Sequence, residues 1–105
     1  MENQYSDFRI YDLEATLRKG QQNAISRKDL ARMMDMPDRK MRELIEKARE
    51  EGCVILNNQD GKGYFLPATI EDIHKQYIQD TNRAMAILKR RKHIRRILKE
   101  AGIQV

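Results

Sequence analysis

The apolar residues of this chain recur with a helical period in three consecutive stretches, which predicts three amphipathic helices. The first covers residues 7–19, and Gly20 is expected to cap its C-terminal end. The second begins after Ser26, a typical N-cap, and ends before Pro37, since proline disfavours helix in the residue ahead of it. The third covers residues 38–51. The apolar residues expected to form the packing faces are Ile10, Leu13, Leu17, Leu30, Met33, Met34, Met41, Leu44, Ile45 and Ala48.

A strand-like region follows the third helix. Residues 54–56 and 64–66 are short apolar runs, and the Asp-Gly dipeptide at residues 60–61 is a strong hairpin-turn signal between them. Residues 24–25, ahead of the second helix, have the character of one more very short strand. Residues 1–68 are therefore expected to form one domain, in which a first helix precedes a helix, a turn, a second helix and a hairpin.

A long final helix is predicted within residues 69–105, from Thr69 with Asp72 to about Lys99, which is roughly 45 Å. It carries two apolar stripes. The stripe expected to pack on the preceding domain consists of Ile70, Ile73, Tyr77, Thr81, Ala84 and Leu88. The stripe expected to pair with a second copy of the chain has heptad-like spacing and consists of Ala84, Ile87, Ile94 and Leu98, with Arg91 in its one polar position. The alternative is that both stripes belong to one curved or ragged core face.

The charged residues are distributed unevenly along the chain, and this points to the kind of partner. The net charge is +5, and residues 69–105 alone carry nine basic and four acidic side chains, which also gives +5. A dense run of cations on one helix creates a strong local positive field. We therefore expect a polyanionic partner, with nucleic acid favoured over a membrane surface.

Few other features of the composition point to chemistry. The single cysteine, Cys53, excludes an intramolecular disulfide and is expected to be a buried thiol. His74 and His93 are too far apart on one helix to converge in a monomer, and no spacing of metal ligands is present. No apolar run approaches the roughly 20 residues of a membrane span, and no signal peptide is evident. We expect a cytoplasmic protein that is not an enzyme and has no cofactor, metal or small-molecule ligand.

The polar face of the third predicted helix has its cations in the first turns and its carboxylates toward the end. If this helix enters the major groove, its first turns meet base edges. Arginine can contact guanine through two hydrogen bonds, and glutamate can accept from the cytosine amino group. The candidate recognition residues are Arg39, Lys40, Arg42 and Glu43. The alternative is a solvated face with ion pairs between residues one helical turn apart.

Three further groups are candidates for contacts to DNA, each with a structural alternative. The start of the second helix, where free N–H groups favour an anion, offers Ser26, Arg27 and Lys28, which could equally be a cap and two solvated cations. The hairpin loop offers Asn58, Gln59 and Lys62, although a plain turn has the same composition. The last helix offers Arg90, Arg91, Arg95 and Arg96 for phosphates, or these are the solvated face of a dimer helix.

Residues 25–66 resemble the winged helix-turn-helix family, including the N-terminal DNA-binding domain of biotin operon repressors. The shared pattern is an S-x-x-D-L-A start, an R-x-L-I recognition helix, an E-x-G end and a GKGY strand. The remainder is similar to the tail of small phage and prophage helix-turn-helix proteins, with Arg83, Ala84 and Ile87 in the R-A-x-x-I segment. The chain departs from the pattern at Pro37, where many members have a Ser or Thr cap, which leaves Asp38 as the candidate cap. The resemblance implies an α+β, mostly α fold: a winged helix-turn-helix with a long C-terminal helix.

Two classes of function remain open at this point. The first is a dimeric, sequence-specific protein that binds double-stranded DNA, as a transcriptional regulator or a replication accessory of a phage-like element. The second is a winged-helix module that binds other proteins and has weak or no affinity for DNA. RNA binding is disfavoured, because the predicted strands lack the several exposed aromatic residues of a base-stacking sheet.

Overall fold

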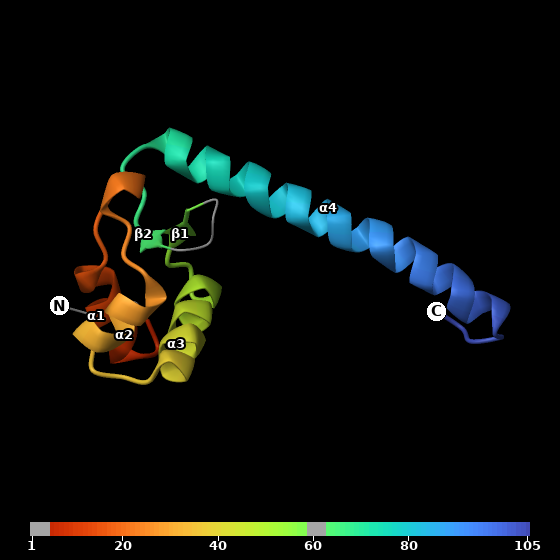
Figure 1. Ribbon diagram of the computed structural model, residues 1–105, viewed down its shortest axis with the longest axis horizontal. Coiled ribbons are helices and arrows are strands. Elements are labelled where there is room, and N and C mark those ends of the chain that lie inside the picture. Colours follow the sequence, from red (N-terminus) through yellow and green to blue (C-terminus); the bar gives the residue numbers. More distant parts are fainter. Residues whose placement is uncertain (1–4, 59–62) are drawn as a thin grey trace. The chain divides into compact units, whose positions relative to one another are not determined.

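The computed structural model describes residues 5–58 and 63–105, which form an α+β, mostly helical fold. The chain divides into two units between His74 and Lys75. The elements are α1 (Phe8–Thr16), the short 3-10 helix η1 (Gln21–Asn23), α2 (Arg27–Met33), α3 (Asp38–Glu50), β1 (Leu56–Asn57), β2 (Tyr64–Phe65) and α4 (Ile70–Glu100), and all of them except η1 are labelled in Figure 1.

Three helices begin at side chains that accept hydrogen bonds from their first free N–H groups. Asp7 caps α1 by accepting from the Arg9 amide at 2.9 Å, and Ser26 caps α2. Thr69 and Asp72 form the predicted reciprocal cap of α4. The cap of α3 differs from the expectation. Pro37 occupies the N-cap position without a side-chain hydrogen bond, and Asp38, the candidate cap, is instead the first residue of the helix.

Three helices also end in the same way, with a residue of positive φ after the last turn. This residue is Asp35 after α2, Gly52 after α3 and Gly102 after α4. In each case the amide of the next residue bonds back to the last turn, as Met36 N does to the Ala31 carbonyl at 2.9 Å. The prediction that Gly20 caps the first helix was wrong. Helix α1 ends at Thr16 and is followed by Leu17 in an extended conformation, and Gly20, whose φ is positive, lies just ahead of η1.

The hairpin pairs β1 with β2 in antiparallel register, with Leu56 opposite Phe65. Both strands are shorter than predicted, and Val54 is exposed. The backbone of β2 also bonds on its other side to the segment ahead of α2, since Ile25 and Tyr64 exchange N–H···O bonds of 2.9 and 2.8 Å. The short strand predicted at residues 24–25 is thus a one-residue bridge that adds a third segment to the hairpin.

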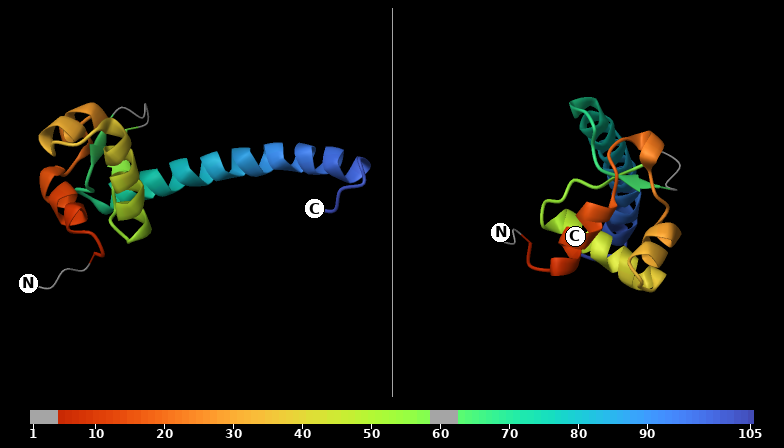
Figure 2. Two further views of the ribbon diagram at one scale, coloured as in Figure 1. Left: turned by 90° about the horizontal axis from the view of Figure 1, so that it is seen from below. Right: turned by 90° about the vertical axis from the view of Figure 1, so that its left-hand side faces the viewer.

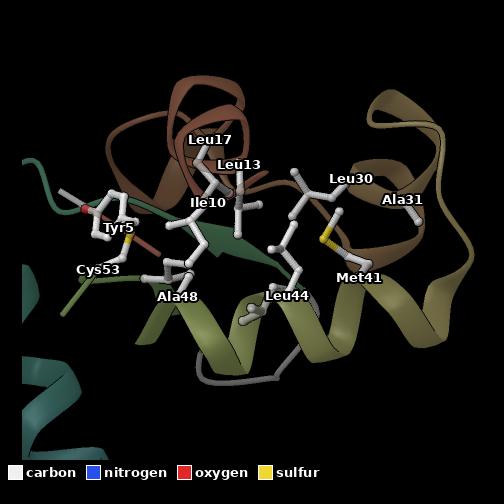
Figure 3. Packing of buried hydrophobic residues seen from close by; sticks show 12 residues of the cluster. Tyr5, Ile10, Leu13, Leu17, Leu30, Ala31, Met41, Leu44, Ala48 and Cys53 are labelled. Atoms are coloured by element: carbon white, nitrogen blue, oxygen red, sulfur yellow. The ribbon is translucent and has the colours of Figure 1, made fainter. Parts of the chain in front are cut away.

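The core lies between α1, α2 and α3, whose buried side chains point toward one another in Figure 3. All the predicted core positions of α1 and α3 are buried, as is Leu30 of α2. The expectation for Met33 was wrong, because its side chain is 54% exposed. A helix of two turns buries only a narrow stripe, and here Ala31 is buried in place of Met33. Met34, which was also predicted to pack, is half-buried against the core.

The helix α4 is continuous over 31 residues (Figure 2), and none of its residues is buried. Its length agrees with the prediction. The boundary at residue 68 and the packing of its first stripe on the preceding domain stay predictions.

Candidate nucleic-acid interface

The exposed face of α3 gathers the four residues predicted to read DNA. Because Met41, Leu44, Ile45 and Ala48 are all buried, the side chains between them are turned outward. The Arg39 side chain is 89% exposed, and those of Lys40, Arg42 and Glu43 are more than half exposed. The structure therefore presents these four side chains on one accessible surface at the start of the helix.

Each of these cations already has a carboxylate beside it. Glu43 lies 3.5 Å from Arg39 and 3.8 Å from Lys40, and Asp38 lies 3.6 Å from Arg42. Exposed ion pairs of this kind stabilise a helix by only about 0.2–1 kcal/mol each. A phosphate or a base edge can therefore compete for these arginines at small cost.

A further ion pair connects the starts of α2 and α3. Arg27 Nε lies 2.7 Å from Asp38 Oδ1, which joins the beginning of α2 to the beginning of α3. The pair raises the pKa of Arg27 and lowers the pKa of Asp38. Among the predicted residues at the start of α2, Lys28 is exposed, and the Ser26 hydroxyl oxygen accepts from the Asp29 amide at 3.1 Å. Asp38, which the sequence analysis did not assign to the site, thus holds Arg27 close to the cations of α3.

Asn58, one of the three predicted DNA contacts of the hairpin, does not lie at a solvent-facing tip. Asn58 donates its backbone N–H to the Gly63 carbonyl at 2.9 Å, and its side-chain oxygen is buried without a donor among the residues described. Its contact with DNA stays a prediction. Gln59 and Lys62, and the predicted turn at residues 60–61, lie outside the described residues.

Arg49 is a residue of this region that the sequence did not single out. Its guanidinium donates to the Ile55 carbonyl from Nε and Nη2, at 3.1 and 2.9 Å, and lies 5.7 Å from the centre of the Tyr64 ring. Nη2 also lies 3.4 Å from Asn57 Oδ1, so Arg49 attaches the last turn of α3 to β1 as well as to β2. Only its position near the end of the helix, where cations are favoured, gave a signal in the sequence.

The cations and apolar positions predicted on α4 are accessible. Arg90, Arg91 and Arg96 are exposed, and Arg95 donates from Nη2 to the Val105 carbonyl at 3.2 Å. The four residues of the predicted dimer stripe are exposed except for the half-buried Leu98. Phosphate contacts and pairing by these residues stay predictions.

Cys53 is buried, as predicted. Burial, followed by a contact of 3.4 Å between its sulfur and Glu14 Oε2, raises the pKa of the thiol to about 11. The thiolate is the reactive form of cysteine, so this side chain is a core residue and not a nucleophile.

Within the parts of the chain that the structure describes, no helix combines the length and the apolar character needed to cross a membrane. Comparison of the chain with protein-family models, with curated proteins and with solved structures gave no match.

Proposed function

We propose that the chain is a sequence-specific, double-stranded DNA-binding protein with a winged helix-turn-helix fold. It acts as a homodimer, as a small transcriptional regulator or a replication accessory of a phage-like element. The observation that carries this proposal is the polarity of α3: one face is fully buried, and the opposite face presents Arg39, Lys40 and Arg42 in its first turns.

The surrounding backbone supports the same interpretation. A tight turn with positive φ at Asp35 connects α2 to α3, and α3 is followed by a hairpin whose second strand bonds back to Ile25. This order of elements suits a recognition helix that enters the major groove while neighbouring segments contact phosphates.

Distinct roles follow for the residues of this surface. Arg39 and Arg42 contact base edges, with guanine as the favoured base, and Glu43 accepts from a cytosine amino group. Lys40, Lys28 and Arg27 neutralise phosphates, together with the hairpin loop and the basic run of α4. The carboxylates beside the arginines hold their side chains in place until DNA replaces them.

Charge reversal tests this assignment. Arg39→Glu and Arg42→Glu are expected to abolish binding to the preferred duplex while far-UV circular dichroism stays unchanged. Arg18→Glu is the matched control, because Arg18 is exposed, lies outside α2 and α3, and has no ion pair within the described residues. Equal loss of binding in all three variants would indicate a general charge effect and would refute the assignment of α3.

One observation favours a second function, a module that binds another protein. The exposed positions of α3 balance four cations (Arg39, Lys40, Arg42 and Lys47) against four carboxylates (Asp38, Glu43, Glu46 and Glu50), so this face has no net charge. In that case duplex binding is weak in the wild type, and the two reversals instead weaken binding to a partner protein.

A further inference from the structure

The helix α4 carries exposed apolar side chains at positions that alternate by four and three residues, which is the spacing of a coiled-coil seam. Tyr77 is 69% exposed, Ile87 48% and Ile94 57%. The complete seam consists of Ile73, Tyr77, Asp80, Ala84, Ile87, Arg91, Ile94 and Leu98. Ile73 and Tyr77 belong to the stripe that was expected to pack on the preceding domain, and pairing through this seam takes the place of that packing. Two of its members are charged, and they have opposite sign.

We propose that α4 pairs with α4 of a second copy of the chain in an antiparallel coiled coil, in the register that sets Asp80 against Arg91 of the partner copy. This inference deepens the homodimer of the proposed function by naming its surface, direction and register.

The two charged positions select the register. In an antiparallel pair the two kinds of seam position face each other, and aligning Asp80 with Arg91 of the partner copy aligns every other seam residue as well. The resulting pairs are Ile73 with Leu98, Tyr77 with Ile94, Asp80 with Arg91 and Ala84 with Ile87, each occurring twice by symmetry. The smallest side chain of the seam, Ala84, thus meets a larger one, and no charge in the seam lacks an opposite.

The charged positions also argue against a parallel pair. Parallel helices in register would place Asp80 against Asp80 and Arg91 against Arg91 at the centre of the seam. Like charges at such positions are destabilising.

The two halves of the helix are complementary in charge as well. Residues 70–80 contain three carboxylates and one lysine, whereas residues 89–99 contain seven cations and no carboxylate. Antiparallel pairing places the acidic half of each copy beside the basic half of the other. Arg83 and Arg90 of the two copies come near each other at the solvent side of the seam, where salt screens their repulsion.

The side chains at Asp80 and Arg91 are available for this pairing. Asp80 accepts one hydrogen bond from Gln76 Nε2 at 2.9 Å, and no described residue forms an ion pair with Arg91. Both side chains are exposed. Pairing across a dimer therefore gives each of these charges an opposite charge at the two positions where the seam is not apolar.

A charge swap measured by sedimentation without DNA tests the register. The full chain is expected to be dimeric, and Asp80→Arg or Arg91→Asp alone should each raise the dimer dissociation constant by at least about tenfold. The double variant Asp80→Arg/Arg91→Asp restores the opposite charges only in the antiparallel register, so its dissociation constant should return to within about threefold of the wild type. Lys89→Asp, which makes the same change of charge at an outer position of the helix, is the matched control, and its dissociation constant should change far less than that of Arg91→Asp.

Disulfide formation tests the direction independently. In a Cys53→Ala background, a mixture of the Ala84→Cys and Ile87→Cys variants should form a mixed disulfide faster than either variant alone, because these positions face each other across the seam. A monomeric wild-type chain, a double variant without rescue, or preferential cross-linking of Ala84→Cys to itself would overturn the proposal. If the chain forms this dimer but its Arg39→Ala variant binds DNA normally, the proposed function of α3 is refuted and this inference stands. If the chain binds DNA through α3 as a monomer, this inference is refuted and the DNA-binding function stands.

Discussion

Arg27 Nε lies 2.7 Å from Oδ1 of Asp38, so an ion pair joins the first residue of α2 to the first residue of α3. The same carboxylate lies 3.6 Å from Arg42. Asp38 therefore neutralises two cations that we propose to contact DNA, at a helix start where a negative charge is also favoured by the helix dipole. The residue stabilises the fold and at the same time weakens the positive field of the proposed interface.

Asp38→Asn is expected to separate these two effects. Releasing Arg27 and Arg42 should raise affinity for duplex DNA by roughly threefold at low salt, a gain that corresponds to one exposed ion pair. The urea midpoint of unfolding should fall, because the link between α2 and α3 and the favourable interaction with the helix dipole are lost. Titration of a labelled duplex and urea unfolding followed by circular dichroism measure the two changes.

Glu50→Gln is the control for that experiment. Glu50 is exposed on the last turn of α3 and pairs with no cation in the described part of the chain. Its replacement removes the same charge without releasing an arginine. If both variants change affinity equally, the effect comes from net charge, and the role of Asp38 is not specific.

The turn between α2 and α3 contains a strained residue, Asp35, with φ of 50°. Glycine accepts this conformation without steric conflict, whereas a β-branched residue does not. We expect Asp35→Gly to raise the free energy of unfolding by about 0.5 kcal/mol and Asp35→Val to lower it by about 1–2 kcal/mol. At Asp12, in the middle of α1, the change to glycine should instead lower it by about 0.5 kcal/mol. Urea unfolding measures both, and a loss of stability in Asp35→Gly would contradict the assigned turn.

Gly63 fits closely against the segment that precedes α2. A Cβ atom at this position would lie 2.8 Å from Ala24 Cβ and 3.1 Å from Asn58 Nδ2. Gly63→Ala should therefore lower the free energy of unfolding by about 1–2 kcal/mol. Ala24→Gly alone should cost less, and the double variant should recover part of the loss, because it removes the atom in conflict. Strict additivity of the two changes, measured by chemical denaturation, would show that the hairpin does not pack on Ala24.

Acid stability should depend on Asp7. Hydrogen bonds from the Arg9 side chain and amide, with weaker attraction from Arg9 and Lys47, lower the pKa of this carboxyl from 3.8 to about 2. A lowered pKa in the folded state stabilises the fold above the unfolded value and loses this effect as the pH falls through the folded value. Asp7→Asn should therefore be less stable than the wild type at about pH 7, and the difference should shrink between about pH 4 and about pH 2.

Denaturant midpoints across this pH range test the contribution of Asp7. Asp12→Asn is the matched variant, since Asp12 is exposed on the same helix and forms no ion pair with a described residue. A difference between wild type and Asp7→Asn that stays constant with pH would contradict the assignment.

Much of the helical part of this fold follows from local rules. Met41, Leu44, Ile45 and Ala48 fall on one face of a helix wherever that helix begins or ends, and all four are buried. Ser26 and Thr69 have the hydroxyl side chains that favour a helix start. These features depend on residues within one turn of each other, so the sequence is sufficient to find them.

The features that escaped prediction depend on how distant segments meet. The pairing of Arg27 with Asp38 requires the turn at Asp35 to bring two helix starts together. The contact of Arg49 with the Ile55 carbonyl requires the chain to reverse after Gly52. Periodicity does not encode these approaches. The ion pairs within α3 are different, because they join residues three or four positions apart, and the sequence analysis gave them as the alternative interpretation of this face.

Selection of bound fragments from random genomic duplexes, over several rounds and at two salt concentrations, shows whether α3 recognises a DNA sequence. Wild-type protein is expected to enrich one motif and to retain it at the higher salt, and Arg39→Ala is expected to lose it. Enrichment of no motif, or binding that is absent at both salt concentrations, would contradict sequence-specific recognition of DNA by α3.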